Sequence, residues 1–370
     1  MPENPDYQPW TLGGPLCRIY EDVPEGEGRR RCVIREEITA GYLESLPDLT
    51  NMIELDIEFS SVSDDAMEYL ARHTQTEVLH LTFCEVSERG LGHLGEMTWL
   101  KKLSLSSSCV TDAGLVHLAG LTQLSELDIS ENYVTDDGVR HIAGLTQLTS
   151  LDISHTNISD LTLHHLASFT NLKSLCLCIY PTDMPDGSTL SVTDEGLNCL
   201  RAMSNLRSLD ISVTSATDAT LKHIGMMTQI ARLNVGATKT TDAGLERLKE
   251  LKSLTNLDIA STAVTDTGLR ALTGLNSLRE LNLCGLNISM RGLRRIAALP
   301  QLRRITIDGE MFPLWALWCL RCRRPRLKIR GIPSNRFGVR MRLIRYRLED
   351  YVERLREYLE TDQGRVENRY

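Results

Sequence analysis

Leucine and isoleucine recur along the chain with a period of 24 residues. The central apolar position falls on Leu55, Leu79, Leu103, Leu127 and Leu151, and after an insertion on Leu209, Leu233, Leu257, Leu281 and Ile305. One more unit is centred on Leu175, where the Val-Thr-Asp element arrives ten residues late, at Val192. A fixed period over most of a chain predicts a solenoid, in which each unit buries its apolar face only against its neighbours.

Each unit divides into an extended half and a helical half. Leu127-Asp128-Ile129-Ser130 alternates apolar and polar residues, which predicts a short strand with Leu and Ile pointing inward. Thr135 and Asp136 then supply a helix cap and a first-turn acid. Strands stack about 4.8 Å apart and helices about 8 to 10 Å apart, so the stack must curve with its strands inside. We therefore predict an α/β horseshoe with a concave parallel β-sheet and convex helices.

The extent of the repeat pattern predicts three regions. Residues 1–30 are rich in Pro, Gly and Glu and are expected to form an irregular arm. The solenoid with its terminal caps is expected over residues 31–332, with a closing strand at 326–330. Residues 333–370 carry an apolar stripe at helical spacing and are expected to form a helical extension. The insertion at residues 179–188 falls between a strand and its helix, which places it at the rim.

The repeated motif is Leu-x-x-Leu-x-x-Leu-Asp-Ile-Ser-x-Thr-x-Val-Thr-Asp-x-Gly-Leu-x-x-Leu, which resembles the leucine-rich repeat family over roughly residues 31–330. The position that most of that family fills with Asn is occupied here by Cys84, Ser108, Asn132, Thr156, Thr214, Thr238 and Thr262. This is similar to the cysteine-containing subclass of F-box leucine-rich-repeat proteins and to bacterial Thr-Asp-x-Gly-Leu repeats. The family resemblance implies a scaffold that binds another protein through the concave face or its rim. The subclass implies an alternative, the substrate-recognition module of a ubiquitin-ligase-type complex.

The predicted concave face carries an acidic central column. Its candidate partner-binding residues are Asp128, Asp152, Glu126, Glu131, Asp210 and Asp258. Carboxylates on adjacent strands repel one another, so gathering them does not add stability, and the column predicts binding of a basic protein. The alternative is that Asp is only the favoured solvent-facing residue of this repeat.

Two aromatic residues are further candidates for partner contacts on the rim. Trp99 occupies a turn position where other repeats carry Gln or Asn, which predicts either an exposed indole or an indole packed on Met97. Tyr180 lies inside the insertion, where a neutral loop is the alternative to a contact with a partner.

The net charge of −8 hides a separation of charge along the chain. Residues 291 to 347 carry 16 Arg and Lys against two acids, whereas residues 1 to 290 are strongly acidic. The basic patch at the predicted cap consists of Arg321, Arg323, Arg324, Arg326, Lys328 and Arg330. This patch keeps attachment to nucleic acid or another anionic surface open as an alternative function. We do not expect nucleic acid, because no aromatic stacking residues interleave with the patch.

No catalytic constellation is found in the sequence. A column of histidines at equivalent positions would be held about 8 to 10 Å apart by neighbouring helices, too far for shared zinc ligation. Cys319 and Cys322 form a single Cys-x-x-Cys without a second pair, which favours a structural role. No phosphate loop, zinc-protease helix or nucleophile elbow occurs. We therefore expect neither enzymatic activity nor a metal or cofactor.

Compartment and assembly are predicted from the remaining features. The N-terminus has no basic start followed by an apolar run, and no apolar stretch is long enough to span a bilayer. The ten cysteines are spread along the repeats, which favours free buried thiols over disulfides. We expect a cytoplasmic monomer without a membrane span.

Overall fold

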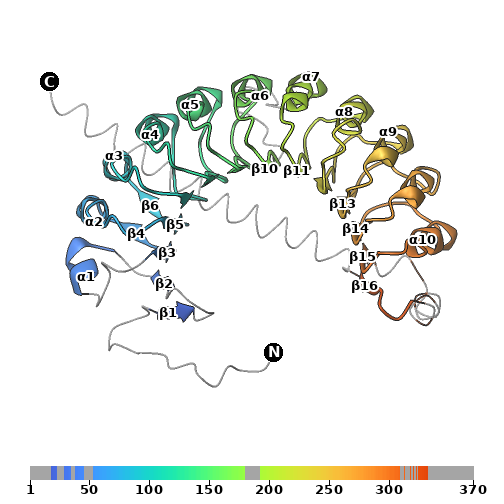
Figure 1. Cartoon of the computed structure of the whole chain (residues 1–370), viewed down its shortest axis with the longest axis horizontal. Helices are drawn as coiled ribbons and strands as arrows, with labels where there is room; N and C mark the ends of the chain where they lie inside the picture. The colour runs from blue at the N-terminus through green and yellow to red at the C-terminus, as the bar shows by residue number, and fades with distance from the viewer. Residues whose placement is uncertain are drawn as a thin grey trace, which may run out of the picture.

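The computed structural model is an open horseshoe with strands along its inner face and helices along its outer face (Figure 1). It describes residues 18–22, 29–34, 38–45, 53–179, 192–308, 312, 317, 320, 322 and 324–331. Within these residues the strands form a 14-stranded sheet. Neighbouring strands are parallel from β2 onward. The predicted α/β horseshoe with a concave parallel sheet is confirmed.

The element bounds follow the 24-residue period. The large sheet contains β1 (Arg18–Asp22), β2 (Arg29–Ile34), β3 (Glu54–Glu58), β5 (Val78–Thr82), β7 (Lys102–Ser104), β8 (Glu126–Asp128), β9 (Ser150–Asp152), β10 (Ser174–Cys176), β11 (Ser208–Asp210), β12 (Arg232–Asn234), β13 (Asn256–Asp258), β14 (Glu280–Asn282), β15 (Arg304–Ile307) and β16 (Lys328–Gly331). A small second sheet pairs β4 (Ser61–Val62) with β6 (Glu85–Val86).

The convex side mixes α-helices with 3-10 helices. The α-helices are α1 (Ala40–Ser45), α2 (Asp64–Leu70), α3 (Glu88–Leu94), α4 (Asp112–Leu118), α5 (Asp136–Ile142), α6 (Asp160–Leu166), α7 (Asp194–Leu197), α8 (Asp218–Ile224), α9 (Asp242–Arg247) and α10 (Met290–Ala297), and the 3-10 helices are η2 (Asn198–Ala202), η3 (Leu248–Glu250) and η4 (Gly268–Gly274). These elements are at most eight residues long, so their stability comes from packing on neighbouring repeats.

The core is one continuous cluster between the sheet and the helices. The central leucines of successive strands lie directly opposite one another, as Leu127 on β8 does with Leu151 on β9. Both side chains are almost fully buried, with 2% and 1% of their surface exposed. The register predicted from the period is therefore the register of the sheet.

The N-terminal edge differs from the sequence prediction. Residues 18–22 were predicted to belong to an irregular arm, but they form β1, which pairs antiparallel with β2. Without β1, the outer edge of β2 would expose unpaired backbone groups, and an added strand satisfies them. At the other end β16 closes the sheet close to the predicted strand. The helical extension at 333–370 and the insertion residues 180–191 lie outside the described residues.

The Thr-Asp pair of the motif links successive repeats. Thr135 donates its backbone N–H and its hydroxyl to the two carboxylate oxygens of Asp112 in the preceding repeat, at 2.8 and 2.6 Å. The same link joins Asp136 to Ser159, Asp160 to Thr193, Asp194 to Thr217, Asp218 to Thr241, Asp242 to Thr265 and Asp266 to Ser289. Each of these carboxylates therefore accepts hydrogen bonds from the next repeat, in addition to its place at the start of its own helix.

The glycine of the Thr-Asp-x-Gly motif leaves space for that carboxylate. A Cβ on Gly244 would lie 2.2 Å from Oδ1 of Asp218, which no real side chain tolerates. Where Thr162 and Thr220 replace this glycine, each hydroxyl donates to the facing carboxylate. Opposite Asp136, Asp194 and Asp218, the position thus holds either glycine or a threonine that donates a hydrogen bond.

Candidate functional site

The candidate site is the centre of the concave face, where the strands are short and their outward side chains are polar. Asp128 on β8 lies directly opposite Asp152 on β9. Ser104 donates to Asp128 from β7 at 3.0 Å, and Ser130 donates to Asp128 from within the same repeat at 2.6 Å. Asp152 accepts from the backbone N–H and the hydroxyl of Ser154 at 2.9 and 2.6 Å. The two carboxylates are therefore half-buried and held in place rather than freely mobile.

Other parts of the acidic column avoid such a juxtaposition. Asn234 lies between Asp210 and Asp258 and donates its side-chain amide to Asp210 at 2.7 Å. Asn282 donates to Asp258 in the same way, also at 2.7 Å. Among the six acidic residues predicted for the site, the structure thus brings Asp128 and Asp152 face to face and keeps Asp210 and Asp258 apart.

The carboxylate of Asp152 is destabilised in its charged form. Burial raises its pKa above the ordinary value, and the neighbouring charge of Asp128 raises it further, against the opposing hydrogen bonds from Ser154. Within the described residues, no Lys or Arg lies within 4.0 Å of either Asp128 or Asp152. Among the residues that the structure describes, two neighbouring half-buried carboxylates thus stand without a cation beside them at the middle of the inner face.

Asp152→Asn is expected to raise the free energy of unfolding at pH 7 by about 1 kcal/mol. The amide removes the repulsion from Asp128 and can donate to it, as Asn234 donates to Asp210. Because the folded-state pKa of Asp152 is raised, wild type regains stability as pH falls through that pKa, so the gain should shrink in acid. Denaturant titrations at several pH values measure this, and a variant less stable than wild type at pH 7 would contradict it.

The two glutamates predicted beside Asp128 have different environments. Glu126 forms an ion pair with Lys102 of the neighbouring strand, with 2.7 Å between Nζ and Oε1. Lys102 therefore offsets the charge of Glu126, and contact of Glu126 with a partner stays a prediction. Glu131 is exposed on the rim and accepts a hydrogen bond from Ser107 at 2.7 Å. We define the acidic centre as Asp128, Asp152 and Glu131.

The indole of Trp99 is a structural contact between repeats. Its N–H donates to the backbone carbonyl of Thr76 at 3.1 Å, and the ring is partly buried against the core. Asn171 and Asn205 make equivalent bonds from the same turn position, to Thr146 at 3.0 Å and Thr170 at 2.9 Å. The indole of Trp99 thus makes the hydrogen bond that a side-chain amide makes in other repeats. It is packed between repeats and is not the fully exposed indole that the sequence allowed. Tyr180 lies outside the described residues.

The predicted basic patch is divided by the structure. Arg321 and Arg323 lie outside the described residues. Arg324 donates to the carbonyl of Leu299 at 2.8 Å just after α10, so it caps a helix end rather than forming a free surface cation. The exposed members are Arg326, Lys328 and Arg330, and the last two project from β16.

Two surface features were missed by the sequence reasoning. Exposed cations precede four strands from β10 onward: Lys173 precedes β10, Arg207 precedes β11, Arg279 precedes β14 and Arg303 precedes β15. All four occupy the same position of the repeat, one residue before the strand, and this recurrence was the available signal in the sequence. Phe59 and Phe83, 24 residues apart, are exposed at the opposite ends of their strands.

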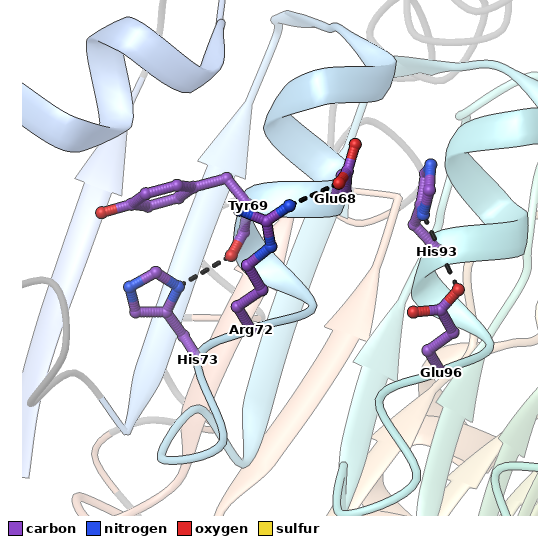
Figure 2. A network of polar contacts seen from close by, with 6 residues as sticks. All are labelled: Glu68, Tyr69, Arg72, His73, His93 and Glu96. Atoms are coloured by element: carbon purple, nitrogen blue, oxygen red, sulfur yellow. Dashed lines mark hydrogen bonds and ion pairs between the residues drawn. The ribbon is translucent and has the colours of Figure 1, made fainter.

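A polar cluster on the convex side, at α2 and α3, is local to each helix (Figure 2). Arg72 pairs with Glu68, and the ring of His73 contacts the carbonyl of Tyr69 at 2.8 Å. At the end of α3, in the next repeat, the ring nitrogen Nδ1 of His93 lies 3.8 Å from Oε1 of Glu96. These contacts join residues three or four apart, which is ordinary stabilisation of helix ends and contains no nucleophile with a base.

The described residues contain no group of three or more His, Cys, Asp or Glu that could hold a metal ion. Cys84 and Cys178 are free thiols. Burial raises the pKa of the Cys84 thiol to about 12 and that of Cys178 to about 11, which makes both poor nucleophiles at neutral pH. No helix in this part of the chain is long and apolar enough to cross a membrane.

Comparisons with known proteins agree with this architecture. Residues 115–329 match the family described as leucine-rich repeat region, and residues 96–119 match the leucine rich repeat family. The chain belongs to the leucine-rich repeat family. No curated protein matches it.

Comparison with solved structures matches two proteins from Listeria monocytogenes str. 4b F2365. An internalin (inlF) is 21% identical with a TM-score of 0.54, and the match covers 82% of this chain and 87% of that one. An internalin C2 (inlC2) is 22% identical with a TM-score of 0.43, covering 60% of this chain and 84% of that one. At these identities the likeness to inlF shows the fold alone.

Proposed function

We propose that the protein is a non-enzymatic scaffold, acting as a cytoplasmic monomer, that binds a basic protein through the acidic centre of its concave face. One observation carries the proposal: Asp128 and Asp152 face one another, half-buried, with no neutralising cation among the described residues. This arrangement costs stability in the free chain, and a cationic partner would relieve it. Leucine-rich repeat solenoids present extended concave surfaces of this kind for binding.

The test compares capture of partners by three baits made from the full chain. Asp128→Lys with Asp152→Lys reverses the charge of the acidic centre. Asp137→Lys with Glu195→Lys makes the same change in net charge at two exposed convex positions. Proteins retained by wild type and by the convex variant, but lost from the concave variant, are the expected result. Equal retention by all three baits, with unchanged circular dichroism spectra, would reject the acidic centre as the binding site.

A second candidate function is attachment to an anionic surface at the C-terminal end of the solenoid. Arg303, Arg326, Lys328 and Arg330 are exposed there, and no ion pair involves them within the described residues. Retention on heparin that falls with salt and is lost in a variant with these four residues changed to Gln would support it. The ubiquitin-ligase alternative is supported only by the repeat subclass, and no contact among the described residues favours it.

A further inference from the structure

Two phenylalanines are stacked in the open on the rim of the concave face. Phe59 directly follows β3 and Phe83 directly follows β5. Their ring centroids are 4.7 Å apart and their planes are within 6° of parallel. Phe59 is 58% exposed and Phe83 is 38% exposed, so neither ring belongs to the core. A water-facing aromatic pair is a feature that binding surfaces use and that folding does not require.

The backbone at these two positions is unfavourable for a bulky side chain. Phe59 has φ of 54° and Phe83 has φ of 55°, in the left-handed region that glycine and asparagine adopt most readily. The equivalent residues in other repeats include Ser107, Ala237 and Gly285. Placing phenylalanine at two adjacent positions of this row costs stability, and exposed rings recover little of it by burial.

The row continues from the rings to a carboxylate. Phe83, Ser107 and Glu131 occupy consecutive repeats, and each is fixed by a backbone hydrogen bond of 2.9 Å to the next repeat. Phe59 covers one face of the Phe83 ring, so the other face is turned away from Phe59, on the side of the next repeat, where Ser107 is buried. Ser107 is small and holds the carboxylate of Glu131 by its hydroxyl at 2.7 Å. The result is an aromatic face and an exposed carboxylate on either side of a short side chain.

The charge of Glu131 is not offset by its neighbour in the row. His155 follows Glu131, and burial lowers the pKa of the imidazole to about 4, so the ring is neutral at physiological pH. Glu131 also stands three residues after Asp128 in the same repeat. The aromatic face therefore adjoins the acidic centre.

We propose that Phe83, Ser107 and Glu131 form a subsite for an arginine side chain of a protein partner, with Phe59 supporting the ring of Phe83. A planar guanidinium stacks on an aromatic face while donating to a carboxylate, a geometry that lysine does not reproduce. This inference rests on the proposed function, because it names the anchor residue of the basic partner. The backbone of the subsite is fixed by hydrogen bonds to neighbouring repeats, which lowers the conformational entropy lost on binding.

A capped Gly-Gly-Arg-Gly-Gly peptide is the direct probe. The chain has five phenylalanines, so a full-length protein labelled only at phenylalanine rings gives few signals, and Phe83→Leu assigns the relevant one. The peptide is expected to shift the Phe83 signal saturably. The same peptide with citrulline, which is planar but uncharged, and Glu131→Gln protein should each bind at least about threefold more weakly. No shift at millimolar peptide, or equal shifts with citrulline, would overturn the subsite.

With the captured partner, Phe83→Asn separates this inference from the proposed function. Asparagine tolerates the left-handed backbone, so folding should be preserved, and Leu161→Asn on the convex side is the matched control because Leu161 is 53% exposed. We expect Phe83→Asn to weaken binding about tenfold and Leu161→Asn to leave it unchanged. If Asp128→Lys with Asp152→Lys abolishes binding but Phe83→Asn does not weaken it, the subsite is wrong and the proposed function stands. If only Phe83→Asn weakens binding, the subsite stands and the proposed role of Asp128 and Asp152 in binding fails.

Discussion

Replacing Leu151 by alanine is expected to lower the free energy of unfolding by about 2 to 5 kcal/mol. Leu151 on β9 is 1% exposed and lies between Leu127 on β8 and Leu175 on β10. Truncation therefore opens a cavity that touches both neighbouring repeats. Because each repeat is stabilised only through its neighbours, the site has no other core that could compensate.

The matched control is Leu161→Ala in the same repeat. Leu161 lies on α6 with 53% of its surface exposed, so its truncation should change stability by less than about 0.5 kcal/mol. Denaturant titrations of wild type and both variants supply the comparison. A loss below about 1 kcal/mol for Leu151→Ala would mean that the strand register is wrong.

Replacing Asp136 by alanine is expected to cost on the order of 3 kcal/mol. The carboxylate accepts the backbone N–H and the hydroxyl of Ser159, at 2.9 and 2.6 Å, and the backbone N–H and the hydroxyl of Thr162. Thr162 is fully buried, so its hydroxyl would lose its partner without gaining water. Asp137→Ala, one residue on and exposed, is the matched control and should change stability by less than about 0.5 kcal/mol.

The cost of Asp136→Ala should depend on pH in a defined direction. Burial alone would raise the pKa of Asp136, but the hydrogen bonds from Ser159 and Thr162 outweigh it and hold the pKa below the ordinary value. A lowered pKa contributes stability above the unfolded-state pKa, and that stability is lost as pH falls through the folded-state pKa. The difference between wild type and variant should therefore be largest at neutral pH and smaller in strong acid. A difference that grows on acidification would refute the link between repeats.

The architecture could be predicted because the same pattern of residues recurs in many units. Most units place Leu at the centre of a strand and Thr or Ser, usually followed by Asp, at a helix start. Ile38 and Leu43 follow the same register into the first, atypical unit, where both are fully buried. The concave position of Asp128 and Asp152 followed from the alternation within each strand. Their mutual opposition followed from the 24-residue spacing alone.

The missed features depend on distances between repeats, which no single unit encodes. Asp136 was predicted as a first-turn acid, but whether it reaches Ser159 depends on how closely two helices approach. Trp99 was considered as a large aromatic contact for a partner, whereas in the structure its indole N–H donates to the carbonyl of Thr76. Phe59 and Phe83 were passed over because a residue directly after a strand gives no sign of its left-handed backbone.

Chemical footprinting of carboxylates tests the central claim most directly. Asp and Glu side chains of the full chain are labelled by carbodiimide with an amine, with and without the captured partner, and the rate at each site is read by mass spectrometry. Bound partner is expected to slow labelling of Glu131, Asp128 and Asp152 and to leave the exposed convex Asp137 and Glu195 unchanged. Protection confined to Asp137 and Glu195, with the concave carboxylates labelled as fast as in the free protein, would contradict binding at the acidic centre.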